Sequence, residues 1–154
     1  MKNLIIDLDG TLTIDEESVP YIDKAPNTKI IEQLQAYKAA GFSIVIYTSR
    51  NMRTFGGDIE QIRAQTLPQI LAWLQKHDVP YDDVVIGKPW CGFDGFYVDD
   101  KAIRPSEFAT LSYEEICALL EGEGKCNCSH TGINDAKSST QSDGIESKPH
   151  TKDS

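Results

Sequence analysis

Short apolar runs that end in polar side chains are the feature that most constrains how this chain can fold. The run NLIIDL ends next to a carboxylate, and FSIVIY leads directly into a threonine, a serine and an arginine. Runs of this length, rich in β-branched and aromatic residues, are typical of buried strands. The pattern predicts four strands, at residues 3–8, 42–47, 84–87 and 96–98.

Helical patterns alternate with these runs. Asn27 is a candidate N-cap for apolar residues that recur at helical spacing until Gly41, and Pro68 suits a first helical turn. Ser112 and Glu115 form a capping box before a last helix. We expect helices at residues 27–41, 66–77 and 112–120, with residues 51–65 irregular or holding a short helix. The alternation predicts an α/β, Rossmann-like, three-layer fold with a mainly parallel central sheet.

The length of 154 residues fits a single domain, and the composition changes towards its end. Residues 123–154 contain no Leu, Val, Phe, Tyr, Trp or Met, so they cannot bury enough apolar surface to offset the entropy of ordering them. We expect residues 1–122 to fold and residues 123–154 to form a disordered polar tail. In that tail, Cys126, Cys128 and His130 are interpreted as two free thiols near a histidine, with a soft metal site as the alternative.

The formal net charge of −9 argues against nucleic acid or an anionic membrane surface as a partner. No apolar run approaches the roughly 18 residues that a membrane span needs. The first apolar run is interrupted by Asp7, which is too early for a signal peptide. These features predict a cytoplasmic protein with no membrane partner.

Polar side chains follow all four predicted strands, and the carboxyl ends of parallel strands meet at one edge of a sheet. We expect that edge to gather six residues: Asp7, Asp9, Thr48, Lys88, Asp99 and Asp100. Because Asp7 and Asp9 are two residues apart on a strand, their side chains project to the same side. One carboxylate can attack phosphorus, while the other can protonate a leaving oxygen and later deprotonate water. This pair therefore suits phosphoryl transfer.

These residues also have purely structural interpretations. The motif Asp-x-Asp-Gly-Thr can be a turn after a strand, Lys88 a solvated loop lysine, and Thr48 a cap of the following turn. Arg50 and Arg53 either clamp a second anionic group of a substrate or lie in an exposed loop. Aromatic residues near the site are more often packed than stacked on a substrate, and three follow Lys88: Trp90, Phe93 and Phe96.

The motif Asp7-Leu-Asp-Gly-Thr11, followed in order by Thr48, Lys88 and Asp99-Asp100, resembles the haloacid dehalogenase superfamily over about residues 3–105. The resemblance implies a phosphatase that acts through an aspartyl phosphate, with the first aspartate as nucleophile and the second as acid and base. It implies catalytic roles for Asp7, Asp9, Thr48 and Lys88.

The resemblance also implies a Mg²⁺ cofactor and a small phosphorylated substrate. Asp7 and Asp99 would supply metal ligands, together with the backbone carbonyl of Asp9. Asp100 would contact the metal through water or orient Lys88. Backbone amides just past the strands would bind the phosphoryl group, which gives four candidate substrate contacts: Gly10, Thr11, Ser49 and Arg50.

Large cap domains of this superfamily are inserted after the first motif or between the second and third motifs. Here residues 12–26 allow only a flap-like hairpin, and residues 51–87 hold one helix and about fifteen further residues. The resemblance is therefore to capless enzymes, some of which accompany capsular polysaccharide biosynthesis, and it implies a sugar phosphate substrate and a homo-oligomer that closes the site. Two alternatives stay open: a phosphoacceptor signalling module and a non-catalytic phosphate-binding module.

Overall fold

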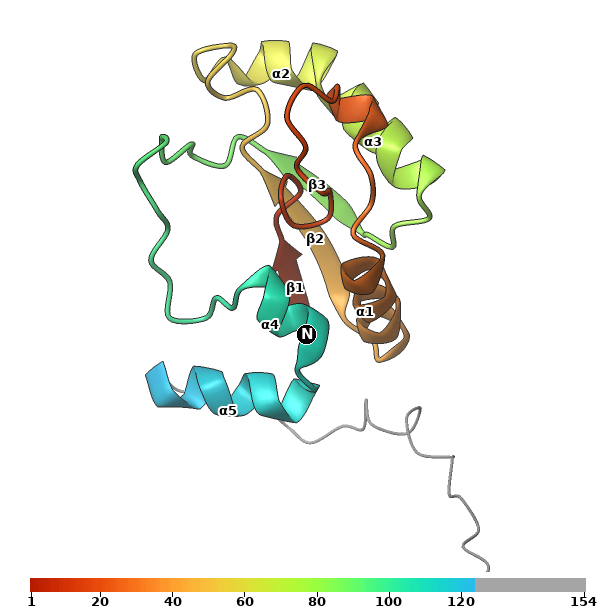
Figure 1. Ribbon diagram of the computed structural model, residues 1–154, viewed down its shortest axis with the longest axis vertical. Helices are drawn as coiled ribbons and strands as arrows, with labels where there is room; N and C mark the ends of the chain where they lie inside the picture. The colour runs from red at the N-terminus through yellow and green to blue at the C-terminus, as the bar shows by residue number, and fades with distance from the viewer. Residues whose placement is uncertain (124–154) are drawn as a thin grey trace, which may run out of the picture.

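The structure of the chain is a computed structural model that describes residues 1–123. Strands and helices alternate along it (Figure 1). The elements are β1 (Asn3–Ile6), the 3-10 helix η1 (Tyr21–Asp23), α1 (Thr28–Ala39), β2 (Ser43–Thr48), α2 (Ile59–Gln65), α3 (Leu67–Lys76), β3 (Asp83–Ile86), α4 (Pro105–Thr110) and α5 (Tyr113–Glu123). Apart from Glu123, the predicted polar tail lies outside the described residues, as does the metal site considered at Cys126–His130.

Three strands form one parallel sheet in the order β1-β2-β3. Ile6 pairs with Ile46, and Ile46 pairs with Val84, so these three side chains share one face of the sheet. The prediction of an α/β fold with a parallel sheet is confirmed, and the arrangement is consistent with a small Rossmann-like fold. The short helix that the sequence allowed within residues 51–65 is also present, as α2.

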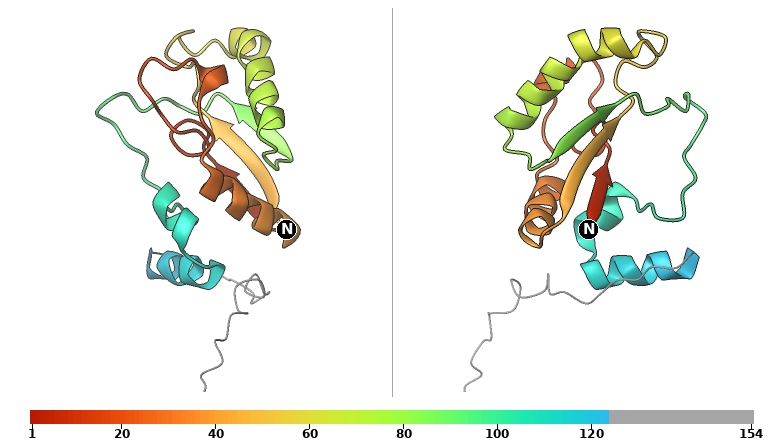
Figure 2. Two further views of the ribbon diagram at one scale, coloured as in Figure 1. Left: turned by 45° about the vertical axis from the view of Figure 1, so that its right-hand side comes forward. Right: turned by 180° about the vertical axis from the view of Figure 1, so that it is seen from behind.

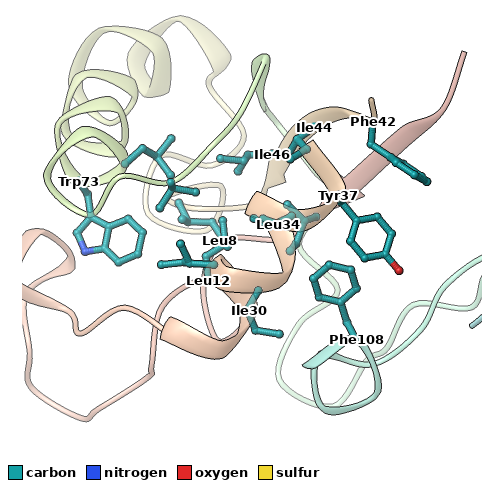
Figure 3. Close-up of a cluster of buried hydrophobic side chains, with 14 of the residues drawn as sticks. Leu8, Leu12, Ile30, Leu34, Tyr37, Phe42, Ile44, Ile46, Trp73 and Phe108 are labelled. Carbon is teal, nitrogen blue, oxygen red and sulfur yellow. The ribbon is translucent and has the colours of Figure 1, made fainter. Parts of the chain in front are cut away.

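The core lies between one face of the sheet and the helices α1 and α3. All four apolar residues that recur at helical spacing in α1 are buried: Ile30, Ile31, Leu34 and Tyr37. Trp73 of α3 is fully buried, and its indole Nε1 donates a 2.9 Å hydrogen bond to the carbonyl of Lys24. Figure 3 shows Trp73 towards one end of this cluster and Phe108 of α4 towards the other. The strands are thereby fixed by packing on both α1 and α3.

The opposite face of the sheet is less well covered. Ile5 pairs with Val45, and Tyr47 pairs with Val85, which places these four side chains on that face. Ile5 is 66% exposed and Val85 is 39% exposed. Within residues 1–123, the third layer that the sequence analysis expected does not cover these two side chains.

The predicted strand at residues 96–98 is wrong. Residues 87–104 contain no helix or strand, and Figures 1 and 2 show this green segment turning away from the sheet before it reaches α4. Phe96 and Val98 are 80% and 88% exposed. Three apolar residues offer few ladder hydrogen bonds, and Gly92, at φ +83°, turns the chain just before them. The outer edge of β1 is consequently not paired with another strand among the described residues.

Helix α4 was not predicted from the sequence, although it has recognisable start signals. Pro105 occupies the first turn, where its missing N–H leaves no bond unmade. The backbone N–H of Arg104 donates a 2.7 Å hydrogen bond to the Glu107 carboxylate, which completes the start of the helix. Phe108 then packs against Tyr37 of α1, with ring centroids 5.2 Å apart. No helix in residues 1–123 is long and apolar enough to cross a membrane.

Two leucines of α3 test how far the core depends on this helix. Leu74 is fully buried and Leu71 is 37% exposed, although both belong to the same helix. We expect Leu74→Ala to lower the free energy of unfolding by about 2–5 kcal/mol, because it leaves a cavity. The matched variant Leu71→Ala should lower it by about 1 kcal/mol or less. Urea unfolding of both variants measures the difference, and equal losses would contradict the placement of α3.

Candidate functional site

The carboxyl ends of the three strands bring together loops that are distant in sequence. The backbone N–H of Lys88 donates a 3.1 Å hydrogen bond to the carbonyl of Thr48, which joins the loops after β2 and β3. The Lys88 ammonium lies 3.3 Å from Oδ1 of Asp7, which follows β1. The structure thus places Asp7, Thr48 and Lys88 at one edge of the sheet, as the sequence predicted.

A tight turn after β1 sets the direction of the two aspartates. The carbonyl of Leu8 accepts hydrogen bonds from the backbone N–H groups of Thr11, Leu12 and Thr13, at 3.4, 2.9 and 3.0 Å. Gly10 has a φ of +72°, which an L side chain rarely adopts, and its N–H donates to the Thr13 hydroxyl at 3.2 Å. The N–H groups of Gly10 and Thr11, predicted to contact substrate, are thus bonded within the turn in this structure. The same turn explains why β1 ends at Ile6 rather than at residue 8.

Asp9 is held by cations from two other segments. The Arg50 guanidinium donates from Nε to Oδ2 at 3.0 Å and from Nη2 to Oδ1 at 2.7 Å, so it binds both carboxylate oxygens of Asp9 in a bidentate arrangement. The Lys24 ammonium lies 3.6 Å from Oδ1 of Asp9 and 2.6 Å from Oδ1 of Asp15. The Arg50 side chain is only 1% exposed. Arg50, predicted as a substrate contact, is therefore first of all the partner of Asp9.

The flap, defined as residues 12–26, supplies parts of this site that the sequence analysis missed. It closes as a hairpin in which the Ile14 N–H donates to the Ala25 carbonyl and Thr13 forms an antiparallel bridge with Pro26. The Tyr21 ring centroid lies 4.3 Å from the Arg50 guanidinium carbon and 4.8 Å from the Lys24 ammonium. The sequence held one indication of this role for Lys24, since it is the only basic residue in the flap and the motif before it carries two aspartates.

The loop after β2 and residue Tyr97 complete the surroundings of Lys88. Thr48 is buried, and its hydroxyl accepts a 3.1 Å hydrogen bond from the Arg50 N–H. The Tyr97 ring centroid lies 4.4 Å from the Lys88 ammonium, and the Tyr97 hydroxyl donates to the Pro89 carbonyl at 2.6 Å. Burial raises the pKa of Tyr97, and a hydrogen bond from the Ser49 hydroxyl opposes that rise. Tyr97 was not among the predicted site residues, since residues 96–98 were predicted to form a strand.

Burial and the nearby charge of Lys88 shift the pKa of the Asp7 carboxyl in opposite directions. Burial raises the pKa of the Asp7 carboxyl above its usual value, and the nearby charge of Asp9 adds to that rise. The Lys88 ammonium and the N–H of Leu8 act in the opposite direction. Lys88 therefore favours the ionised form of the Asp7 carboxyl in a place where burial disfavours it.

The predicted metal ligands are only partly brought together. Asp99 and Asp100 are exposed in residues 87–104, and Oδ1 of Asp99 accepts a 2.8 Å hydrogen bond from the Lys101 N–H. In residues 1–123, no group of three or more His, Cys, Asp or Glu side chains is arranged to hold a metal ion. The Asp7 side chain is 33% exposed, while Arg50 donates to both carboxylate oxygens of Asp9, which leaves the Asp9 backbone carbonyl as the contact expected from that residue. This arrangement does not fit a complete Mg²⁺ site.

Comparison with known proteins gives one strong similarity. The chain resembles a protein from Vibrio cholerae of known crystal structure, with 56% sequence identity and a TM-score of 0.78. The matched region covers 80% of this chain and 99% of that one. The chain belongs to the same family as that Vibrio cholerae protein. The shared region is long enough to include the sheet and its loops.

Two weaker similarities are to chains in structures of the Pnkp1/Rnl/Hen1 complex, one of them described as an RNA repair complex. Their sequence identities are 16% and 21%, and both TM-scores are 0.43. They cover 79% and 64% of this chain and 30% of each matched chain. Similarity at this level supports no conclusion about this chain. No family model matches the chain, and no curated protein matches it.

Replacing Lys88 tests the ion pair with Asp7 directly. Because the Lys88 charge holds the pKa of Asp7 down, Lys88→Met should raise that pKa further above its usual value. The ionised fraction of Asp7 would then be lost at a higher pH as the solution is acidified. Carbon-13 NMR titration of the Asp7 carboxyl in metal-free protein measures this shift. Lys101→Met, an exposed lysine of residues 87–104, is the control, and an unchanged pKa in Lys88→Met would refute the ion pair.

Proposed function

We propose that this chain is a phosphatase of the haloacid dehalogenase type that hydrolyses phosphomonoesters through an aspartyl phosphate on Asp7. The observation that carries the proposal is the pairing of two carboxylates with two different cations. Asp7 lies 3.3 Å from the Lys88 ammonium, while Asp9 is gripped by Arg50. One carboxylate is thus left partly exposed beside a cation, and the other is held in a fixed orientation next to it.

In the first step, a carboxylate oxygen of Asp7 attacks the phosphorus atom, and the bond from phosphorus to the leaving oxygen breaks. Asp9 enters this step protonated and gives its proton to the leaving oxygen, which departs as an alcohol. Asp9 is then the carboxylate that Arg50 holds. In the second step, Asp9 accepts a proton from water, whose oxygen attacks phosphorus. The acyl phosphate bond breaks, which releases inorganic phosphate and restores the Asp7 carboxylate.

Arg50 and Lys24 act as positioning residues in this scheme. Two hydrogen bonds from Arg50 fix the plane of the Asp9 carboxylate, and Lys24 links it to Asp15 of the flap. Lys88 offers charge to the phosphoryl oxygens as well as to Asp7. The hydroxyls of Thr48, the last residue of β2, and of Ser49, which follows it, are the proposed hydrogen-bond donors to the same oxygens.

Mg²⁺ is part of the proposal on chemical grounds. A phosphate dianion facing two carboxylates needs more positive charge than Lys88 provides, and Mg²⁺ would neutralise that negative charge. Asp7 and Asp99 remain the proposed ligands, with Asp100 in an outer role. Since Asp99 lies apart from Asp7, metal binding would require the chain around Asp99 to take another position.

The proposed substrate is a small phosphorylated metabolite, with a sugar phosphate from capsular polysaccharide biosynthesis as the first choice by resemblance. The flap is the only insertion between β1 and α1, which fits a capless enzyme that is completed by a homo-oligomer. The net charge of −9 disfavours nucleic acid and anionic membranes as partners. The cytoplasm is the proposed location.

Hydrolysis of 4-nitrophenyl phosphate tests the proposal. We expect turnover that requires Mg²⁺, is abolished by excess chelator, and falls by at least about 1,000-fold in Asp7→Asn, which removes the nucleophile. The matched control is Asp83→Asn, an exposed aspartate at the start of β3 and therefore at the opposite edge of the sheet. Full activity of Asp7→Asn, or full activity in chelator, would refute the proposed mechanism.

A further inference from the structure

Three side chains near the proposed phosphate site form a cluster that the reaction does not use. Arg53 lies in the loop after β2, and Trp90 and Phe93 lie in the segment after β3. The Arg53 guanidinium carbon is 5.8 Å from the Trp90 ring centroid and 4.9 Å from the Phe93 ring centroid. The two rings meet edge to face, with centroids 5.3 Å apart. We call these three residues the aromatic–arginine cluster.

The cluster is tied to the same edge of the sheet as the reacting groups. Trp90 is two residues after Lys88, whose N–H bonds to the Thr48 carbonyl. On the other loop, the Met52 N–H donates to the Ser49 carbonyl at 3.0 Å, just before Arg53. A molecule held by Asp7 and Lys88 through its phosphoryl group would therefore have its remaining part near this cluster.

The side chains of the aromatic–arginine cluster are too exposed to serve mainly as part of the hydrophobic core. Trp90 is 41% exposed and Phe93 is 80% exposed. Arg53 is exposed, and none of the ion pairs found within residues 1–123 includes it. In a chain with a net charge of −9, an arginine that stacks on two rings and has no acidic partner keeps its N–H groups available for an anion from outside.

We propose that the aromatic–arginine cluster is a leaving-group subsite for a ring that carries a second oxyanion, a carboxylate or a second phosphate. The inference rests on the proposed phosphatase and names its substrate class. Aromatic faces and edges make apolar contacts with the C–H face of a sugar ring. The planar guanidinium, stacked on the rings, presents a fork of donors that matches a carboxylate or a phosphate. The preferred substrate is therefore a phosphorylated sugar with a second negative group.

A matched substrate series tests this subsite. Glucose 1-phosphate, glucuronic acid 1-phosphate and glucose 1,6-bisphosphate share one ring and differ only at C6, which is neutral, a carboxylate or a phosphate. Arg53→Gln should lower kcat/KM for the two acidic substrates by about 10-fold to 100-fold relative to glucose 1-phosphate, mainly through KM. The two acidic arms show which oxyanion Arg53 binds better.

The control variant is Arg63→Gln, an exposed arginine of α2 that lies 4.0 Å from Glu60. It should leave the relative kcat/KM values unchanged. Trp90→Leu should raise KM for all three sugar phosphates, because each of them presents the same ring. If Arg53→Gln changes all three substrates equally, or changes none, the proposed subsite is wrong.

Binding measurements separate this proposal from the proposed function. Calorimetric titration with glucose 1,6-bisphosphate is done in the Asp7→Asn background, with and without Arg53→Gln. Weaker binding on loss of Arg53 supports the subsite, even if no substrate is hydrolysed and the phosphatase proposal fails. Equal binding with and without Arg53, or no binding in either variant, overturns the subsite even if aryl phosphate is hydrolysed.

Discussion

The parallel ladder that joins β1, β2 and β3 is the constraint on which the candidate site depends. It aligns the carboxyl ends of three strands, so that Asp7, Thr48 and Lys88 meet although the sequence separates them widely. The ladder is fixed from one side by the packing of α1 and α3, whose apolar stripes are buried together. The position of the Lys88 ammonium against Asp7 is thus a consequence of core packing some distance away.

A second constraint comes from charge. Asp9, Arg50, Lys24 and Asp15 form a chain of ion pairs that links the turn after β1, the loop after β2 and the flap. Because the Arg50 side chain is buried, removing Asp9 would leave a buried cation without its partner, which is strongly unfavourable. The same contacts that fix the orientation of Asp9 therefore also hold the flap beside it, and the Tyr21 ring lies against both cations.

Much of this arrangement could be predicted from the sequence, because it follows from local patterns. The runs before Asp7, Thr48 and Lys88 have the length and β-branching of buried strands, and the helical spacing in α1 matches its buried residues. The predictions that were wrong or missing concern contacts between segments that are distant in the sequence. Residues 96–98 have a strand-like composition. Whether so short a run forms a strand depends on the glycines around it and on the strand that it could pair with. Here it forms none, so Asp99 is not brought to Asp7. The contacts of Lys24 and Tyr21 depend on how the flap folds back, which no short pattern encodes.

We propose Asp7 as the nucleophile, so phosphorylation of Asp7 during turnover is the event to detect. In the proposed mechanism, Asp9→Asn removes the base that activates water, while 4-nitrophenolate still departs without a proton, so the aspartyl phosphate should accumulate. Rapid acid quenching and mass spectrometry of the peptide that contains Asp7 would detect it. We expect a phosphate on Asp7 that forms and decays at the rate of turnover in the unsubstituted protein and persists in Asp9→Asn. Turnover with no phosphate on Asp7 at any time, in either protein, would contradict it.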